Sequence, residues 1–378
     1  MAKRKYDVIV IGAGPSGLNA ASLVAQKGYS VLVLEAKREV GKNVVCTGIL
    51  GRETFERFGF SRDSLINDVQ KVRFVSPFGT SISYDHPSIL ASVVDRERFD
   101  KGIFDSAVKK GADATLSFRV NNVSVHKDSV EVSGTHEGLE ERKYRGSVVI
   151  LSTGVEHDLS KKLGLGHPKR FIKAAQKYIC YSGKEDISLL VGNRIARGGF
   201  GWIVPVQNNM ALAGLITEGN PKNGFATMME HCGLEETGDV LQLKPIAQGG
   251  VSRTFGERVL IVGEAAGQVK TTTGGGVFFG LLCSEIASNI IDQGFKDGSF
   301  SANKLSMYEK QWKAKIGTEI RVGTVARNFC GKLKDQQVEK MFSLVRTDGF
   351  FDFIAKNADF DWHGKFVLKL LKMLVGVN

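Results

Sequence analysis

The N-terminal segment has the hydrophobic pattern of a buried strand followed by a helix. Tyr6 to Ile11 are largely apolar, and Leu18 to Ala25 continue with apolar residues at helical spacing. Between them, Gly12, Gly14 and Gly17 form the pattern G-x-G-x-x-G. The first glycine allows a sharp turn, the second lets the backbone approach a pyrophosphate, and the third lets the helix pack closely on the strand. We therefore expect a bound dinucleotide at the start of this helix.

A second apolar run, Ser30 to Leu34, ends in an acidic residue, Glu35. In dinucleotide-binding units a carboxylate roughly 20 residues after the glycine motif accepts hydrogen bonds from a ribose diol. Either an adenine dinucleotide or a flavin dinucleotide fits this pattern, and the alternative interpretation of Glu35 is a solvated strand end.

After this unit, the periodicity changes several times along the chain. Alternating residues from Val69 to Tyr84, around Pro77-Phe78-Gly79, predict a hairpin, and Asp95 to Lys110 returns to helical spacing. Further strands are predicted at Ser117 to His126, Val130 to Thr135, Glu141 to Arg145, Ser147 to Leu151, and in short pieces from Phe171 to Gln242. The strand Val259 to Val262 precedes a helix from Val277 to Ile291, a helix is also predicted at Arg52 to Phe58, and the chain from Ser301 onward is helical and basic.

These patterns predict an α/β fold with a Rossmann-like dinucleotide-binding domain, a second mostly antiparallel sheet that would bind substrate, and a helical C-terminus. We expect the dinucleotide-binding domain, which becomes the FAD-binding domain if the cofactor is a flavin dinucleotide, to be discontinuous and to comprise residues 1–70, 91–165 and 246–295. The substrate domain would comprise residues 71–90 and 166–245, and the helical region residues 296–378.

Composition narrows the class of protein. The 378 residues are 42% hydrophobic and 24% charged, without an apolar run long enough to span a membrane or a secretory signal, so we expect a cytoplasmic protein. The five cysteines have no metal-ligand or disulfide spacing, and we expect no metal. The net charge of +11 indicates an anionic partner: phospholipid, nucleic acid or an acidic redox protein. No nucleic-acid-binding module accompanies this charge, which makes nucleic acid the weakest of the three.

A second motif at a strand end suggests an extended cofactor. Gly263-Glu264-Ala265-Ala266-Gly267 follows the strand Val259 to Val262, and Gly274-Gly275-Gly276 precedes the next helix. A flavin dinucleotide held by the first glycine motif needs an acidic hydrogen-bonding group and close backbone at a second strand end. Glu264 and the three glycines are suited to these two tasks.

Four motifs resemble those of the flavoprotein superfamily that includes aromatic hydroxylases, flavin-dependent halogenases and geranylgeranyl reductases. They are the first glycine motif, the helix start Asp95-Arg96-x-x-Phe99-Asp100, the strand end at Gly263, and the glycine turn with its helix. Their order and spacing match over about three quarters of the chain. The superfamily usually has Gly-Asp and a further Asp-Gly where this chain has Gly263-Glu264 and Thr153-Gly154, which puts a hydroxylase-like use of NAD(P)H in doubt.

One stretch favours the geranylgeranyl reductase branch. Arg197 to Pro205 resembles the P-x-x-Y-x-W-x-F-P signature of that family, with Phe200, Trp202 and Pro205 matching in kind. Halogenases have a similar W-x-W-x-I-P segment, so the aromatic pair alone does not separate the two. Geranylgeranyl reductases similarly carry a cysteine followed by a glycine near the flavin, as in Val45-Cys46-Thr47-Gly48.

The resemblance implies FAD as the cofactor and a set of site residues. The cofactor-binding residues would be Gly12, Gly14, Pro15, Ser16, Gly17, Glu35, Ala36, Cys46, Thr47, Gly48, Arg98, Gly154, Gly263, Glu264, Gly267, Gly274, Gly275, Gly276 and Val277. Phe200, Trp202 and Pro205 would contact the substrate, and Cys46 would deliver a proton or gate the site. Without the resemblance, Phe200 and Trp202 are interpreted as ordinary core, Cys46 as an inert apolar residue, and His126, His136, His157 and His167 as surface residues.

The resemblance thus implies an FAD-dependent reductase of isoprenoid C=C bonds, with hydride delivered from flavin N5 to a polyprenyl lipid. The electron donor would be NAD(P)H or a ferredoxin. The segment Gly364 to Val377, with Lys365, Lys369 and Lys372 on one helical face, predicts peripheral contact with the inner face of the membrane or a helix docked on the protein's own core. The alternatives are a monooxygenase or halogenase of a small aromatic substrate and a membrane-peripheral electron-transfer flavoprotein.

Overall fold

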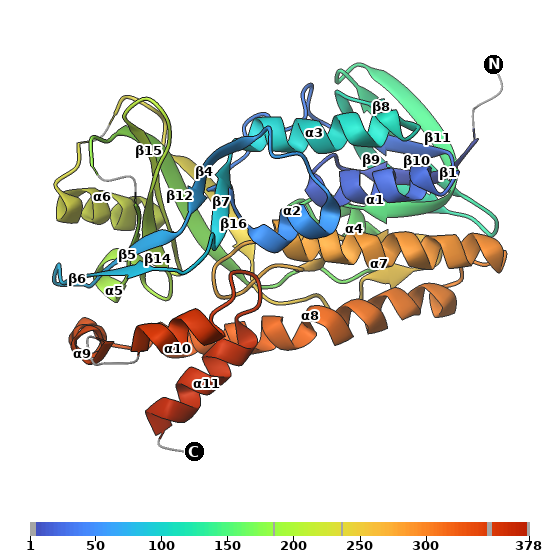
Figure 1. The fold of residues 1–378 in the computed structure, drawn as a ribbon. Coiled ribbons are helices and arrows are strands. Elements are labelled where there is room, and N and C mark those ends of the chain that lie inside the picture. Colours follow the sequence, from blue (N-terminus) through green and yellow to red (C-terminus); the bar gives the residue numbers. More distant parts are fainter. Residues whose placement is uncertain (1–4, 184–185, 236, 346–349, 376–378) are drawn as a thin grey trace.

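The N-terminal strand lies inside an eight-stranded sheet (Figure 1). The structure is a computed structural model, and it describes residues 5–183, 186–235, 237–345 and 350–375. The path of the sheet is β17-β18-β11-β1-β2-β8, and β10 and β9 extend it from β11. β1 pairs in parallel with both β11 and β2, so that Val8 lies between Val148 and Val31. The strands are β1 (Lys5–Ile11), β2 (Val31–Leu34), β8 (Ala112–Thr115), β9 (Phe118–Val125), β10 (Val130–His136), β11 (Glu140–Leu151), β17 (Phe255–Gly256) and β18 (Val259–Ile261).

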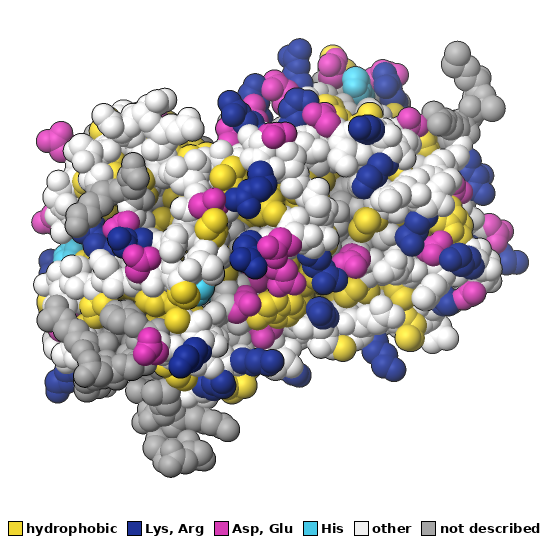
Figure 2. All heavy atoms as spheres, viewed as in Figure 1, with side chains coloured by type: hydrophobic (Ala, Val, Ile, Leu, Met, Phe, Trp, Pro, Cys, Tyr) yellow, Lys and Arg dark blue, Asp and Glu magenta, His cyan; other side chains and the backbone are white. Residues whose placement is uncertain are grey.

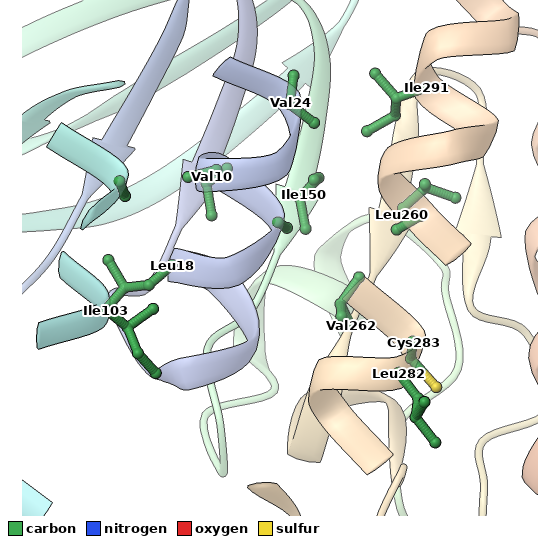
Figure 3. Close-up of a cluster of buried hydrophobic side chains, with 14 of the residues drawn as sticks. Val10, Leu18, Val24, Ile103, Ile150, Leu260, Val262, Leu282, Cys283 and Ile291 are labelled. Atoms are coloured by element: carbon green, nitrogen blue, oxygen red, sulfur yellow. The ribbon is translucent and has the colours of Figure 1, made fainter. Parts of the chain in front are cut away.

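Both faces of this sheet are covered, which explains why its strands are apolar runs without alternation. Val8 and Val10 pack with helices on one face, whereas Ile9 and Ile11 pack on the other face with residues of β9, β10 and the segment after β11. The helical face has side chains from α1 (Pro15–Gln26), α3 (Arg96–Lys109), α7 (Val277–Lys296) and α8 (Ala302–Cys330). Figure 3 shows the meeting of α1 and α7 over the sheet.

A second sheet of seven strands lies at the other end of the molecule (Figure 1). Its order is β16-β12-β15-β14-β13-β5-β6, and all neighbours are antiparallel except β13 and β5. The strands are β5 (Lys71–Val75), β6 (Ser81–Asp85), β12 (Phe171–Cys180), β13 (Ile187–Leu190), β14 (Phe200–Pro205), β15 (Met210–Thr217) and β16 (Gln242–Ala247). A small sheet, β3-β7-β4, packs against it through apolar side chains and consists of β3 (Ile49–Gly51), β7 (Ala91–Val94) and β4 (Leu65–Val69).

The remaining elements are short helices and a helical C-terminus. They are α2 (Arg52–Phe58), α4 (Asp158–Lys162), α5 (Asn193–Ala196), α6 (Pro221–Cys232), the 3-10 helix η1 (Gly263–Ala266), α9 (Asp335–Val345), α10 (Phe350–Asn357) and α11 (Gly364–Val375). The long helix α8 packs along α7, and α10 and α11 follow at its C-terminal end (Figure 1).

Most element predictions are confirmed, including the hairpin β5–β6, the helices α2, α3 and α7, the antiparallel second sheet and the helical C-terminus. Two predicted strands, Glu141 to Arg145 and Ser147 to Leu151, are one continuous strand, β11, because its first half pairs with β10 and its second half with β1. Sequence analysis also missed α6. Its signals were the cap Asn220, whose side chain accepts from Lys222 and Asn223 N–H, and Pro221 in the first turn.

Candidate functional site

The first glycine turn is built by close backbone contacts. Gly12 has φ +104°, and a Cβ there would lie 2.3 Å from the Ser152 carbonyl oxygen at the end of β11. A Cβ on Gly17 would lie 2.2 Å from the Gly12 carbonyl oxygen. Gly14 differs, because a Cβ there would meet nothing within 4 Å, and no side chain caps α1 at this residue. The start of α1 therefore keeps the open approach and the free N–H groups that a pyrophosphate needs.

Glu35 belongs to this turn rather than to the solvent. Its Oε2 accepts from the Ala13 N–H at 2.7 Å, and its Oε1 accepts from the Lys37 N–H at 2.8 Å. Each carboxylate oxygen has a further lone pair. Glu35 thus fixes the turn and can also accept hydrogen bonds from the hydroxyl groups of a ribose. The neighbouring Ala36 is exposed.

The two motifs, about 250 residues apart in the chain, meet at Ser16. A Cβ on Gly263 would lie 2.6 Å from Ser16 Oγ, and a Cβ on Gly280 of α7 would lie 2.0 Å from it. Gly263 also has φ +76°. The absence of side chains at these two glycines lets α1, η1 and α7 converge, so a cofactor at the first turn can extend to the second motif.

Gln268, which follows η1, and Tyr308 of α8 hold the strand end at Gly263. Its N–H donates to Gln268 Oε1 at 2.7 Å, Gln268 Nε2 donates to the Tyr308 hydroxyl, and that hydroxyl donates to the Ile261 carbonyl. Burial raises the pKa of Tyr308 well above its usual value, so it stays a neutral donor. Next to this network, Glu264 forms an ion pair with Lys244 of β16 at 3.0 Å.

The second glycine turn, Lys270 to Gly276, closes on itself through backbone hydrogen bonds. Gly274 N–H donates to the Lys270 carbonyl at 2.7 Å, and Lys270 N–H donates to the Gly275 carbonyl at 2.9 Å. Gly274 has φ +79° and lies against the second sheet, because a Cβ there would be 3.2 Å from Ile246 Cδ1. Gly276 precedes α7 without a side-chain cap, which leaves the first N–H groups of α7, including Val277, for a ligand.

A buried arginine ties the second turn to the second sheet. Arg327 of α8 donates from Nε to the Thr271 carbonyl and from one terminal nitrogen to the Thr272 carbonyl, both at 2.6 Å, and from the other to the Gly198 carbonyl just before β14. Burial lowers the pKa of Arg327 to about 10, which still leaves it protonated at neutral pH. Arg327 therefore positions the turn relative to the sheet.

Residues 358–364, which we call the C-terminal strap, cover the turn from the other side. The strap lies between α10 and α11, beside the start of α7 (Figure 1). Asp361 accepts from Lys270 Nζ at 2.7 Å, and both side chains are buried. His363 Nε2 donates to the Phe360 carbonyl, so its Nδ1 accepts from the Thr272 hydroxyl. Burial, and then the Lys270 ammonium, lowers the pKa of His363 to about 4, which keeps the ring neutral.

Cys46 lies half-buried in the loop before β3, beside the buried Arg96 guanidinium. Arg96 pairs with Asp100 at 2.9 Å. Burial alone would lower the pKa of Arg96, but Asp100 and Cys46 raise it above its usual range. The loop passes close to β7, because a Cβ on Gly48 would lie 2.4 Å from the Val94 carbonyl oxygen. The neighbouring Thr47 is half-buried.

Arg98, another predicted cofactor contact, lies on the surface of α3. Its side chain is 75% exposed and its nearest acidic partner is Asp95, at 3.7 Å. Gly154 lies in the segment after β11 with φ +62°, and a Cβ there would meet nothing within 4 Å. These two residues remain predicted cofactor contacts. Gly267, with φ +66°, has a role in backbone packing, because a Cβ there would lie 2.2 Å from the Gly249 carbonyl oxygen.

The predicted surface position of His157 is wrong. The ring is buried, packs near His167 and Phe171 with centroids 6.4 and 5.8 Å away, and has no hydrogen-bond partner for either nitrogen among the described residues. Burial, followed by His167, lowers its pKa. Leu159 and Leu165 pack in one apolar cluster with Ala265 and Ala266 of η1, and the neighbouring His157 is buried together with them.

The three predicted substrate contacts, Phe200, Trp202 and Pro205, lie on two different faces of β14. Phe200 and Trp202 point to the side of the small sheet, with ring centroids 6.0 Å apart, whereas Pro205 lies on the opposite face by alternation. An apolar cluster surrounds the two rings between the sheets. It includes Ile49 after the Cys46 loop, Ile216, Ile246 beside Gly274, and Phe360 of the strap. This cluster connects the start of β3, which follows the Cys46 loop, with the second glycine turn and the aromatic pair.

Sequence reasoning missed the side chains that hold the second turn. They are Lys270, Arg327, Asp361 and His363, and none of them belongs to a motif. Arg327 lies in α8, and the other three lie in loops, so no periodicity or spacing in the sequence indicated their partners. Among the described residues, no group of three or more His, Cys, Asp or Glu side chains forms a metal site.

The glycine cradle, the convergence at Ser16 and the uncapped starts of α1 and α7 fit an extended dinucleotide such as FAD. The model of the pyridine nucleotide-disulphide oxidoreductase family matches residues 6–182. Digeranylgeranylglycerophospholipid reductase 1 of Methanococcoides burtonii is 27% identical, over 93% of this chain and 92% of its own. Digeranylgeranylglycerophospholipid reductase 2 of Methanothermobacter thermautotrophicus is 28% identical, over 89% and 91%.

Solved structures agree on the fold. A geranylgeranyl bacteriochlorophyll reductase-like protein from Thermoplasma acidophilum superposes with a TM-score of 0.86 at 23% identity and covers 98% of this chain and 96% of its own. A flavin-dependent brominase superposes with a TM-score of 0.73 at 18% identity, over 99% of this chain and 100% of its own. Over most of its length the chain is thus similar to digeranylgeranylglycerophospholipid reductases, and it shares its fold with a geranylgeranyl bacteriochlorophyll reductase-like protein and a flavin-dependent brominase.

Proposed function

We propose that this protein reduces isoprenoid C=C bonds of a geranylgeranyl lipid. Reduced FAD supplies a hydride from N5 when it is bound at the two glycine turns. The observation that carries the proposal is the apolar cluster beside the second turn, where Gly274 adjoins Ile246 and Ile216 and the cluster continues to Phe200 and Trp202. An unactivated alkene is a poor hydride acceptor, so close alignment and exclusion of water must supply much of the rate.

The aromatic pair, the second turn and Cys46 each have a part in this proposal. Phe200 and Trp202 would hold a prenyl chain against the second turn and keep water out, since an aromatic wall buries a large apolar area. Backbone N–H groups at Gly275, Gly276 and Val277 would stabilise negative charge on the pyrimidine edge of reduced FAD. Cys46, whose loop leads into the cluster at Ile49, would deliver the proton to the second alkene carbon or gate access.

Product mass tests this proposal. The purified protein is reduced chemically without oxygen and incubated with a geranylgeranylated glycerophospholipid, and products are measured by mass spectrometry. We expect gains of two hydrogens per reduced bond, a loss of at least tenfold in rate for Cys46→Ala, and near-normal rates for the buried control Cys283→Ala. Unchanged lipid, together with oxygen-dependent conversion of an aromatic substrate, would favour a monooxygenase or halogenase instead.

We also propose that the C-terminal end contacts a lipid surface, which would give access to a membrane-borne substrate. Lys365, Leu368 and Lys369 of α11 are exposed, with Leu368 48% accessible, and the Lys372 side chain lies outside the described residues. No helix among the described residues could cross a membrane. A basic amphipathic helix of this kind can lie in the headgroup region instead. Lys and Arg elsewhere are interspersed with Asp and Glu on the face in Figure 2.

Vesicle sedimentation separates the two roles of α11. Each lysine contributes about 1 kcal/mol near an anionic surface, so K365E with K369E would weaken binding to phosphatidylserine-containing vesicles by at least about thirtyfold. Lys310→Glu, an exposed change on α8, is the control and should have a smaller effect. If wild-type protein does not sediment with anionic vesicles, α11 is a helix docked on the protein alone.

The electron donor, NAD(P)H or a ferredoxin, can be identified by testing which of them reduces the bound FAD.

A further inference from the structure

A buried ion pair lies directly behind the second glycine turn and joins three parts of the chain. Lys270 begins the turn, and its Nζ lies 2.7 Å from Asp361 Oδ1 and 3.2 Å from the Phe360 carbonyl oxygen. The ammonium also lies 4.6 Å from the centre of the Phe360 ring. Both side chains are less than 7% exposed. Gly51 at the end of β3 makes room for the carboxylate, because a Cβ there would lie 2.0 Å from Asp361 Oδ2.

The lysine points toward the turn rather than away from it. A Cβ on Gly275 would lie 3.0 Å from Lys270 Cε and 3.5 Å from Lys270 Nζ. Gly275 is the middle glycine of the turn at which FAD would place its pyrimidine edge. The Lys270 ammonium would therefore lie next to the position at which reduced FAD would carry its negative charge.

A buried ion pair contributes little net free energy to the stability of a fold. Removing two charges from water costs several kcal/mol per ion, and a well-packed apolar pair is often as stable. In a poorly screened interior, however, fixed charges act strongly on a third charge nearby. Lys270 would favour the reduced, anionic cofactor, and Asp361 would moderate that effect.

We infer that Lys270 and Asp361 are positioning residues that set the reduction potential of the bound FAD, with opposite signs. The inference rests on FAD binding at the second turn, which belongs to the proposed function, but it does not depend on the lipid substrate. The C-terminal strap thus contributes a charge to the cofactor site besides covering it.

Spectroelectrochemical titration of the FAD-loaded protein tests the inference without substrate. We expect Lys270→Met to lower the midpoint potential and Asp361→Asn to raise it, and the double variant to lie between them. A tenfold change in relative affinity for reduced over oxidised FAD corresponds to about 30 mV for a two-electron couple. We expect at least this change in each single variant. Lys101→Met and Asp105→Asn, which remove an exposed ion pair of α3, should leave the potential unchanged.

Shifts of the same sign, or no shift, would overturn the inference, because a purely structural pair would loosen the site in the same way whichever partner is removed. If Lys270→Met does not retain FAD, Asp361→Asn decides alone, and an unchanged or lower potential contradicts the inference. Failure of the wild-type protein to bind FAD would instead contradict the cofactor assignment. If the two single variants shift the midpoint potential in opposite directions but the wild-type protein does not reduce lipid, only the proposed substrate is contradicted.

Discussion

The two glycine turns of the site are held in different ways. The first, from Gly12 to Gly17, is fixed by backbone contacts with β11 and by one carboxylate, Glu35. The second, from Lys270 to Gly276, is fixed by side chains that come from α8 and the C-terminal strap, about 50 to 90 residues further along the chain. The first turn is therefore fixed mainly by backbone packing, which the glycine spacing signals, whereas the second depends on individual side chains from distant segments.

Glycine substitutions give the largest expected effect in this comparison. Gly12→Ala would force a Cβ to 2.3 Å from the Ser152 carbonyl at a positive φ, and should destabilise the protein by on the order of 4 kcal/mol and abolish FAD binding. Urea unfolding and FAD titration measure both. Gly14→Ala is the matched variant: with nothing within 4 Å of its Cβ, it should change stability by less than about 1 kcal/mol.

FAD binding distinguishes the two roles of these glycines. Gly14→Ala should still weaken FAD binding by at least tenfold, because the added methyl group occupies the side from which the pyrophosphate approaches. Unchanged FAD affinity in Gly14→Ala would contradict the position assigned to the cofactor at the first turn.

Loss of Arg327 should affect mainly the second turn. Arg327→Met leaves the carbonyls of Thr271, Thr272 and Gly198 without their donor, at a cost of about 3 kcal/mol. We expect weaker FAD binding and earlier unfolding in urea. Arg321→Met, on an exposed turn of the same helix, serves as control, and an equal loss in that variant would show that α8 as a whole, rather than Arg327, supports the turn.

Acid should loosen the strap through protonation of His363. His363 has a pKa of about 4 in the folded protein against 6.5 for an unperturbed histidine. The unfolded chain therefore binds the proton more readily, so the stabilisation is present above pH 6.5 and is lost as the pH falls toward 4. Over this range wild-type protein should lose about 2 kcal/mol more unfolding free energy than His363→Gln. Parallel pH curves of the two proteins in urea unfolding would contradict this role of His363.

Much of the fold followed from the sequence, and so did the local geometry of the first turn. The turn at Gly12, the carboxylate of Glu35 and the helices α3 and α7 have local signals: glycine spacing, strand ends and apolar periodicity. Partners such as Arg327 and Asp361 have no such signal, because a single charged residue on a helix or in a loop is more often exposed. His157 shows the same limit, since its burial depends on the packing of distant segments.

The smallest expected effect concerns the aromatic wall. Trp202 is buried with its indole N–H unpartnered among the described residues, so Trp202→Phe removes an unsatisfied donor while it leaves a small gap. These changes nearly cancel, and stability should change by less than about 1 kcal/mol. Thermal unfolding measures this change. A loss as large as that expected for Trp202→Ala, about 3 to 5 kcal/mol, would mean that the indole N–H has a partner after all.

Reoxidation of the reduced FAD by lipid tests the central claim most directly. The protein is reduced under strictly anaerobic conditions, mixed with a geranylgeranylated lipid or with its fully saturated counterpart, and followed by visible absorbance. We expect the spectrum of oxidised FAD to return with the unsaturated lipid alone, with one FAD oxidised for each double bond reduced. FAD that stays reduced with both lipids until oxygen or a quinone is admitted would contradict the assignment as an isoprenoid reductase.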